Sequence, residues 1–394
     1  MPDFIQSQIK GLRRSSARMP KPAECMIVTR LAARSIAAEA GVSAKDFLAA
    51  LDGKPATDFV PQLYAYRATE RSYTFYARGR HELVELATSG IEIGVEVKPT
   101  PDAIKAHFKP EEPDHKALES LWEARDWTSL GELTGAVLRH LRNRGTPVLV
   151  FNGAALFETG RQDEAMKLIN EYAGKVAPGW TMNFTAVSLY YLGMDKLRRG
   201  DRDAARQLLE QAYEQNAFDR IARALEKLTG QRPPKPAPLW REKRFPVQYD
   251  LPTLEETPAR RVSLAQTLDA MPERKLLIVC LLANYRGNGP YADFMLRYHN
   301  FATYFSPFLH GLHVLTAEAT RRHDRDWYYK TEDQVRAAGL PVTVLHEADA
   351  AVTLAVMPTG SPFILILDRD GDVAYEGELE SVDFWETLAR KALV

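Results

Sequence analysis

The sequence predicts a protein of several domains, with a mixed α/β module at the N-terminus, an α-helical repeat in the middle and an α/β domain at the C-terminus. Three observations support this fold class. The chain has 394 residues, enough for two or three domains of ordinary size. Residues 231–244 contain four prolines, which favour an extended linker. Before this stretch the pattern is helical, whereas after it short β-type runs alternate with helices.

These observations set the expected boundaries. We predict a mixed α/β module of unknown role over residues 1–113 and a helical region over residues 114–230. The linker then occupies residues 231–244, and the C-terminal domain residues 245–394.

Charge and cysteine content argue against several classes of protein. Lys and Arg number 51 and Asp and Glu 52, for a formal net charge of -1, so binding of nucleic acid through the overall field is not expected. The chain's two cysteines, Cys25 and Cys280, stand 255 positions apart. They provide no disulfide framework, no CxxC pair and no four-thiolate metal site. We predict no cofactor and no metal. Since no apolar run is long enough to cross a membrane, we expect a cytoplasmic protein without a membrane span.

The middle region contains a weak internal repeat, in which residues 153–165 match residues 193–205. Each copy has a glycine, a second glycine seven residues later (Gly160, Gly200) and an alanine five residues after that (Ala165, Ala205). The first glycine and the alanine allow two antiparallel helices to approach closely, and the second glycine supplies the turn. A degraded copy lies around residues 121–141.

This spacing resembles the tetratricopeptide repeat family, whose stacked helical hairpins bind peptides on a concave surface. The copies depart from the family because they are 40 residues apart instead of 34 and because Lys196 stands where an aromatic residue is preferred. An array of helical hairpins without a peptide-binding groove is the alternative.

The N-terminal module has three readable segments. Residues 36–53 resemble a helix-turn-helix, but the second helix would carry Ala44, Lys45 and Asp46 instead of a basic, base-reading face. A small packing motif with Ser43 as helix N-cap is therefore favoured. Residues 63–76 alternate like a β-hairpin, and residues 91–97 alternate like a half-buried strand.

The C-terminal domain shows the most specific pattern. Strands are predicted over 275–283, 312–316, 342–345, 363–367 and 373–376, with a turn at Asp370–Gly371. Helices are predicted over 290–305, 331–339 and 383–392.

This order, together with the series from Gly360 to Gly371 (GSPFILILDRDG), resembles the TlpA-like branch of the redoxin family, which has the thioredoxin fold. The resemblance covers residues 245–394, and it implies that Pro362 occupies the family's cis-proline position. The family's paired cysteines are missing. The corresponding segment reads ANYRGNG over 283–289, with Arg286 and Gly289 at the two cysteine positions. Dithiol exchange is therefore not expected there, and Cys280 is interpreted as a buried small hydrophobic residue.

The resemblance also implies a candidate binding groove in which the 283–289 loop faces the segment before the 363–367 strand. Its residues would be Tyr285, Arg286, Asn288, Ser361 and Pro362. A guanidinium beside a helix entrance suits a carboxylate or phosphate, whereas the alternative is a solvated surface loop. His310, His313 and His323 could form a metal site if a carboxylate joined them, but separated histidines at the start of a strand are interpreted as surface or packing residues.

Three functions follow, in order of preference. The first is a non-catalytic scaffold or adaptor that binds a partner protein or peptide through the helical repeats and the thioredoxin-like domain. The second is an enzyme or sensor that binds a small anionic or thiol ligand at the Arg286 loop. The third is a DNA-linked regulator that uses residues 36–53.

Overall fold

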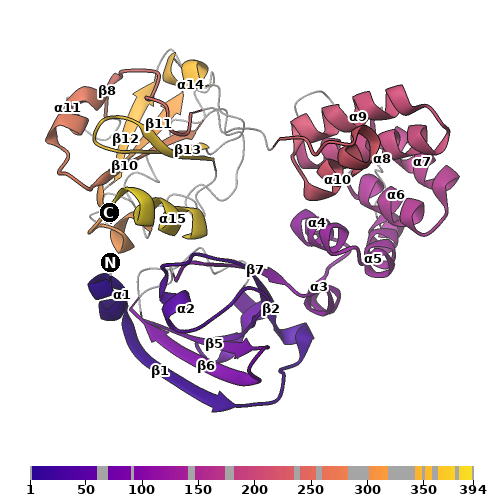
Figure 1. The fold of residues 1–394 in the computed structure, drawn as a ribbon, viewed down its shortest axis with the longest axis horizontal. Helices are drawn as coiled ribbons and strands as arrows, with labels where there is room; N and C mark the ends of the chain where they lie inside the picture. Colours follow the sequence, from indigo (N-terminus) through magenta and orange to yellow (C-terminus); the bar gives the residue numbers. More distant parts are fainter. Residues whose placement is uncertain are drawn as a thin grey trace. The chain divides into compact units, whose positions relative to one another are not determined.

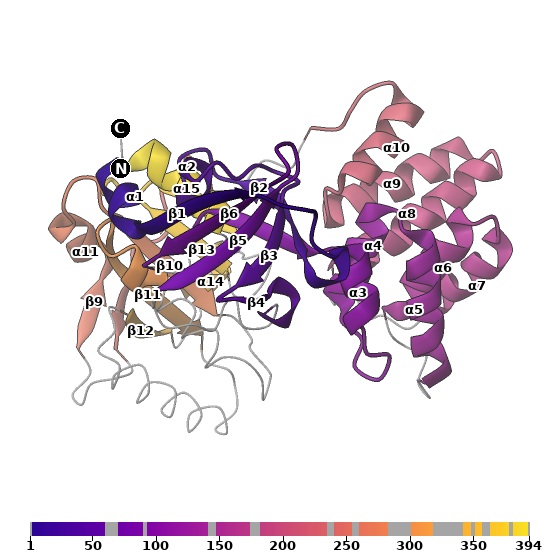
Figure 2. The ribbon, with the colours of Figure 1, turned by 90° about the horizontal axis from the view of Figure 1, so that it is seen from below.

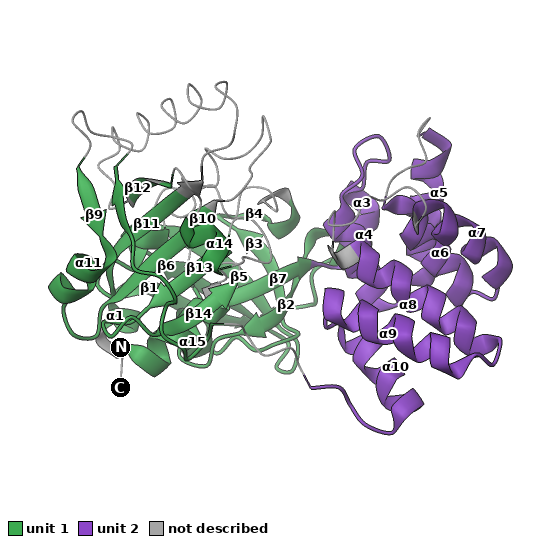
Figure 3. Cartoon of the chain, turned by 90° about the horizontal axis from the view of Figure 1, so that it is seen from above, with its two compact units in different colours: residues 1–98, 238–394 green, residues 99–237 purple. Residues whose placement is uncertain are grey.

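The computed structural model describes most of the chain, and it forms two units (Figure 3). Unit 1 comprises Met1–Lys98 together with Pro238–Val394, and unit 2 is Pro99–Ala237. Unit 1 thus combines both ends of the chain, an arrangement that the sequence did not predict. The described residues are 2–59, 70–89, 93–140, 147–173, 182–234, 240–253, 260–282, 301–317, 342–347, 351–356, 363–377 and 381–392.

The N-terminal part of unit 1 is a seven-stranded sheet (Figure 2). Its order is β1-β6-β5-β3-β2-β7, with β4 paired to β3. The pairs β1–β6, β6–β5, β5–β3 and β3–β2 are antiparallel. Its elements are α1 Pro2–Gln8, β1 Ile9–Ser16, η1 Pro22–Glu24, β2 Met26–Leu31, α2 Ile36–Glu39, β3 Phe47–Leu51, β4 Lys54–Pro55, η2 Ala56–Phe59, β5 Arg71–Ala77, β6 Glu82–Thr88 and β7 Val95–Pro99.

The helix-turn-helix interpretation of residues 36–53 is wrong. The expected second helix is replaced by β3, whose Leu48 and Leu51 are buried in the core. Ser43 is not a helix N-cap, because its N–H donates to the Asp46 carboxylate at 2.8 Å and the next residues turn through Lys45 at φ 75. The cap of α2 is instead Ser35, whose Oγ accepts from the Ala38 N–H.

The two other N-terminal predictions were displaced along the chain. The hairpin was predicted over residues 63–76, of which 63–69 lie outside the described part. The observed hairpin is β5–β6 over residues 71–88, and its turn lies between the paired residues 77 and 82. The strand predicted over 91–97 begins only at Val95. Gly94 has φ +78, which extended backbone does not allow, so the strand starts after it.

The C-terminal part of unit 1 has a thioredoxin-like sheet of five strands in the order β12-β11-β10-β13-β14 (Figure 1). The pairs β10–β11 and β11–β12 are parallel, whereas β10–β13 and β13–β14 are antiparallel. All five predicted strands are present. The bounds are β8 Asp250–Pro252, β9 Arg261–Ser263, α11 Leu264–Ala270, β10 Leu276–Leu282, β11 Leu309–Ala317, β12 Val342–Glu347, α14 Ala351–Val356, β13 Phe363–Leu367, β14 Val373–Gly377 and α15 Ser381–Lys391.

Local signals explain several of these elements. Ser263 accepts from the Gln266 N–H and begins α11, as a serine before an apolar helix start predicts. Gly371 has φ +81 and makes the turn between β13 and β14. The predicted helix over 331–339 lies outside the described residues. Of the one over 290–305 only residues 301–305 are described, and 301–304 are helical.

The central strand β10 is buried on both faces, and each face belongs to a different core. Ile278 and Cys280 point into one core, and Val279 and Leu281 into the other. Such double burial is the reason that β10 reads as a continuous apolar run. The second core is closed by the β8–β9 ribbon, by α11 and by α14, all of which contribute buried side chains to it.

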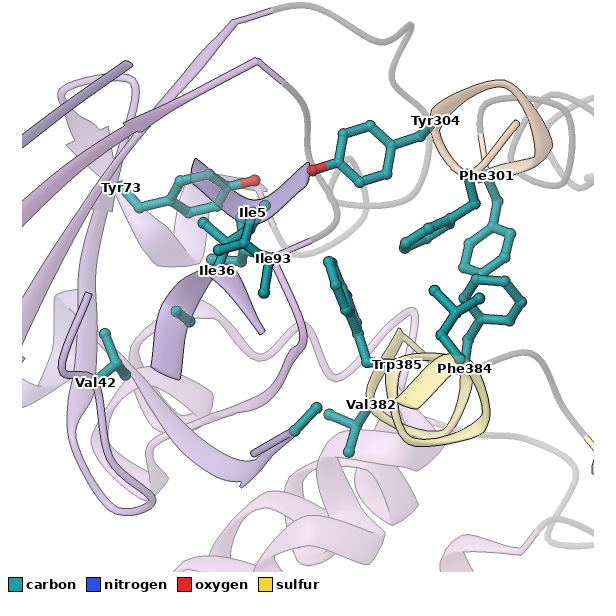
Figure 4. Packing of buried hydrophobic residues seen from close by; sticks show 14 of the residues in the cluster. Ile5, Ile36, Val42, Tyr73, Ile93, Phe301, Tyr304, Val382, Phe384 and Trp385 are labelled. Carbon is teal, nitrogen blue, oxygen red and sulfur yellow. The ribbon is translucent and has the colours of Figure 1, made fainter. Parts of the chain in front are cut away.

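The first core is shared by the two ends of the chain (Figure 4). Trp385 on α15 has an exposed fraction of 1% and lies between side chains of the N-terminal sheet and side chains of the helical turn at 301–305. Phe4 of α1 contacts the same group, with ring centroids 6.2 Å from Trp385 and 4.9 Å from Phe308. Residues from the N-terminal segment therefore complete the core beneath the thioredoxin-like sheet.

An ion-pair network crosses the same junction. The Arg30 guanidinium on β2 donates to Glu96 on β7 at 2.8 Å and to Asp383 on α15 at 2.5 and 3.3 Å. The two bonds to Asp383 have the bidentate geometry that orients a guanidinium and a carboxylate. The Arg30 side chain has an exposed fraction of 41%, so this network positions α15 more than it stabilises the fold.

Unit 2 is entirely helical in its described part. It begins earlier than the predicted boundary at residue 114, because α3 contributes Ile104 to the core of the helical unit. The predicted linker is also partly attached to unit 1, since the Glu242 N–H donates to the Val373 carbonyl at 2.8 Å. The helices are α3 Pro101–His107, α4 His115–Ala124, α5 Trp127–His140, α6 Val148–Glu158, α7 Gln162–Ala173, α8 Met182–Arg198, α9 Arg202–Gln215 and α10 Asp219–Thr229.

The two repeat copies form the helical hairpins α6–α7 and α8–α9, and their small residues are packed as the spacing predicts. A Cβ added to Gly153 would lie 2.7 Å from Cγ1 of Ile169, and one added to Gly193 would lie 3.0 Å from Cγ of Leu209. Ala165 and Ala205 are fully buried opposite them. Gly160 and Gly200 have φ of +92 and +85 and begin the turns.

Ala165→Leu should lower the free energy of unfolding of the helical unit by about 1–3 kcal/mol, because no room exists for a larger side chain between α6 and α7. Urea unfolding followed by circular dichroism measures this change. The same substitution at the exposed Ala106 is the control and should shift the midpoint little. If both variants unfold at the wild-type midpoint, the close helix approach is not under packing constraint.

A fragment of residues 238–394 should not fold alone, because it would expose the apolar surface of α15 that the N-terminal sheet covers. We expect dye binding to exposed apolar surface and a broad thermal transition. As the control, residues 99–237 are replaced by a flexible linker, which should preserve cooperative unfolding because the core of the helical unit contains only its own residues. A monodisperse, cooperatively unfolding 238–394 fragment would contradict the shared core.

Candidate functional site

The candidate groove predicted from the sequence lies outside the described residues. This applies to Tyr285, Arg286, Asn288, Ser361 and Pro362 alike. The strands that lead to these two segments are described, and they are direct neighbours. Leu281 near the end of β10 pairs with Phe363 at the start of β13. The chain therefore leaves β10 and enters β13 at the same edge of the sheet, which is a condition for the predicted groove.

Both cysteines are buried and lie in different cores. Cys280 is on the central strand between Val314 and Ile364, and burial raises the pKa of its thiol. Cys25 lies in a small cluster with Phe47 and Tyr76. Burial, with a smaller contribution from Glu24, raises the pKa of Cys25 to about 11.

Thiol chemistry requires an accessible thiolate, and neither cysteine provides one. The interpretation of Cys280 as a buried small hydrophobic residue is confirmed, because its exposed fraction is 0%.

A buried carboxylate stands at the carboxyl end of β12, where ligands often bind in α/β sheets. Both Glu347 oxygens are used within the fold. Oε1 accepts from the Thr353 N–H at 2.9 Å and Oε2 from the Thr353 hydroxyl at 2.8 Å. Glu347 therefore caps the first turn of α14, and at the other end of that helix the Trp240 indole donates to the Val356 carbonyl at 2.9 Å. Sequence reasoning missed Glu347. Its position just after a predicted strand was the signal that could have identified it.

The three histidines of the candidate metal site have different surroundings. His313 is buried, and its Nδ1 lies 2.7 Å from the Tyr249 hydroxyl. His310 is exposed, and His323 lies outside the described residues. Among the described residues no group of three His, Cys, Asp or Glu side chains is placed to hold a metal ion.

Unit 2 contains a cluster of aromatic and charged side chains around Arg220 of α10. The guanidinium carbon lies 5.0 Å from the ring centroid of Trp122 and 4.5 Å from that of Trp127. The same guanidinium pairs with Glu158 at 3.2 Å and contacts the Tyr191 hydroxyl at 3.3 Å. Cation–π contacts and a carboxylate thus compensate one cation whose side chain is only 12% exposed.

The hydrogen bonds of Tyr191 complete this Arg220 cluster. Its hydroxyl donates to Glu158 at 3.1 Å and accepts from the Trp122 indole at 3.1 Å. Burial, supported by the charge of Glu158, raises the Tyr191 pKa well above its usual value, so the hydroxyl remains a donor. Burial likewise raises the pKa of the neighbouring Tyr190 to about 12.

The cluster connects helices that are distant along the chain. Phe218, at the start of α10, packs on Trp122 of α4 with ring centroids 5.1 Å apart. Side chains of α4, α5, α6, α8 and α10 therefore meet at one place in the helical unit. Sequence reasoning missed the cluster because the partners of Arg220 are far away along the chain and no motif connects them.

Comparisons with known proteins show no family for this chain. No protein-family model and no curated protein matches the chain. Among solved structures it is similar to a putative thioredoxin from Neisseria meningitidis, with 18% identity, coverage of 37% of this chain and 89% of that chain, and a TM-score of 0.28. It is also similar to a putative thiol:disulfide interchange protein from Chlorobium tepidum, with 16% identity, coverage of 38% and 94%, and a TM-score of 0.27.

At these identities the likeness concerns the fold alone. The thioredoxin-like description of this portion rests on its own strand order, and the chain has no CxxC pair. Within the described residues, no helix is both long and apolar enough to cross a membrane.

Arg220→Met should lower the stability of the helical unit by about 2–3 kcal/mol, because it leaves the partly buried Glu158 without its cation. Chemical unfolding measures this, and the added substitution Glu158→Gln should recover part of the loss. Arg223→Met is the matched control, because Arg223 on the same helix is 56% exposed and pairs with an exposed Asp219. Equal losses for Arg220→Met and Arg223→Met would show that the cluster does not organise the helices.

Proposed function

We propose that this protein is a non-catalytic adaptor that binds a partner protein or peptide. The observation that carries the proposal is the burial of both cysteines in separate cores. A thioredoxin-like domain without an accessible thiol retains its sheet and its strand ends but cannot exchange disulfides. Two free, buried thiols suit a reducing compartment, and we place the proposed function in the cytoplasm.

The helical unit is the proposed docking module. Its hairpins pack closely at glycine and alanine positions, which supports the proposed tetratricopeptide-like arrangement, and the Arg220 cluster joins the helices to one another. The partner then contacts the outward faces of the second helices, α7 and α9. These faces carry charges of both signs, including Glu164 and Lys167 on α7 and Arg206 and Glu214 on α9.

The redox part of the proposal is tested by reduction of insulin disulfides. We expect no turnover from the wild-type chain, and no difference in a Cys25→Ala, Cys280→Ala double variant. Alanine is used because both sites are buried and apolar. In the native state neither thiol should react with an aromatic disulfide reagent, whereas both should react after unfolding. Turnover that disappears in the double variant would refute the non-catalytic assignment.

The docking part is tested by affinity capture with the full chain, followed by identification of the retained proteins. Capture is repeated with the variant in which a flexible linker replaces residues 99–237. A partner that binds the full chain and not the shortened one supports docking on the helical unit. Equal capture by both chains would refute this surface.

A second candidate is favoured by the pairing of Leu281 with Phe363. We propose as the alternative function the binding of a small anionic or thiol ligand at the Arg286 loop. Titration calorimetry with glutathione tests it: Arg286→Lys should weaken binding because a bidentate contact is lost, and Arg286→Ala should weaken it more. Equal affinity in all three chains would reduce Arg286 to a solvated charge.

A further inference from the structure

An open cavity of about 400 Å³ lies in the thioredoxin-like part of unit 1, away from the strand ends described above. It is lined by side chains from the start of β9, from α11 and from β11. Those used below are Arg260, Arg261, Gln266, His310 and His313. None of the described residues that line it is acidic. Neither the adaptor function nor the Arg286 loop makes use of this cavity.

His313 places a buried imidazole at the cavity wall. Its exposed fraction is 6%, and its Nδ1 lies 2.7 Å from the Tyr249 hydroxyl. Burial raises the Tyr249 pKa far above its usual value, so this hydroxyl keeps its proton. Where the hydroxyl donates to Nδ1, the neutral imidazole carries its own proton on Nε2, which is then the nitrogen that can donate to a ligand.

The local field is positive. Burial, with smaller contributions from the charges of His310 and Arg260, lowers the His313 pKa to about 4. The imidazole is therefore neutral near pH 7 beside two basic side chains. A neutral imidazole beside arginine side chains suits an anion, whose charge the guanidinium groups offset without a proton transfer.

The arginines are held in place by the backbone of the β8–β9 ribbon. The Thr253 N–H donates to the Arg260 carbonyl at 2.7 Å, and the Arg260 N–H donates to the Thr253 hydroxyl at 3.1 Å. Thr253 also forms a β-bridge with Leu345 of β12. Arg261 forms an ion pair with Asp250, in which its Nε lies 3.2 Å from the carboxylate Oδ2. Asp250 does not line the cavity. The ribbon is thus attached to the sheet that carries His313.

We propose that this cavity binds a phosphate group, held by Arg260 and Arg261 and by the His313 imidazole. Donors approach from three elements, which suits the several oxygens of a tetrahedral oxyanion. A planar carboxylate would be satisfied by a single guanidinium. Gln266 of α11 lines the same cavity, and its side-chain amide adds a neutral donor.

The proposal is tested by titration calorimetry of the full chain with inorganic phosphate at constant ionic strength, with acetate as the comparison anion. Saturable phosphate binding is expected, and acetate should bind more weakly. Arg260→Gln should weaken phosphate binding about tenfold, the effect of losing one charge-assisted contact. Arg369→Gln is the matched control, since Arg369 is a 49% exposed arginine of the same part of the chain.

Two further arms identify the source of the phosphate and the location of the site. Phosphoserine peptide and glycerol phosphate are compared, and tighter binding of one of them names the natural class of ligand. Arg286→Gln distinguishes this cavity from the Arg286 loop, because loss of phosphate binding in that variant alone would assign the phosphate to the loop. Absence of saturable binding, equal affinity in Arg260→Gln and wild type, or loss only in Arg286→Gln would each overturn the proposal.

Discussion

Burial of the central sheet on both faces is the constraint on which unit 1 depends. The β10 and β13 side chains alternate between two cores, and neither core can be left open to water. The β8–β9 ribbon, α11 and α14 close one side. On the other side α15 carries Phe384 and Trp385, whose aromatic surface extends beyond the thioredoxin-like sheet to the N-terminal strands. The N-terminal segment therefore acts as a structural cover for this domain as well as a module in its own right.

Unit 2 solves a different problem, because its helices have no sheet against which to pack. Close approach at Gly153 and Gly193 joins neighbouring helices into hairpins. The Arg220 cluster then connects helices that are distant in sequence. A cation that is nearly buried has to be compensated, and the two tryptophans, Glu158 and Tyr191 do so from four other helices. That requirement fixes the position of α10 against these helices.

The same physical reasoning separates structural polar groups from candidate sites. Glu347 has both oxygens occupied, and the Arg220 cluster satisfies itself, so each contributes to the fold and neither remains available for a ligand. The cavity beside His313 differs because basic groups surround it while no described acid lines it. The buried cysteines provide no accessible thiolate for the disulfide exchange associated with a thioredoxin-like fold, and the proposed function therefore rests on binding.

The sequence by itself determined the local elements. Apolar runs predicted the strands of the thioredoxin-like part, and the Gly–Gly–Ala spacing predicted the packing of the two hairpins, because these signals act between residues close along the chain. The predicted groove at Arg286 and Pro362 stays a prediction. Only the tertiary structure decided that residues 47–51 form a strand, since Phe47 and Leu48 are held by neighbouring strands that override local helix preference. It alone joined Arg30 to Asp383 and Tyr249 to His313, because such pairs form only when distant segments pack together and leave no periodicity in the sequence.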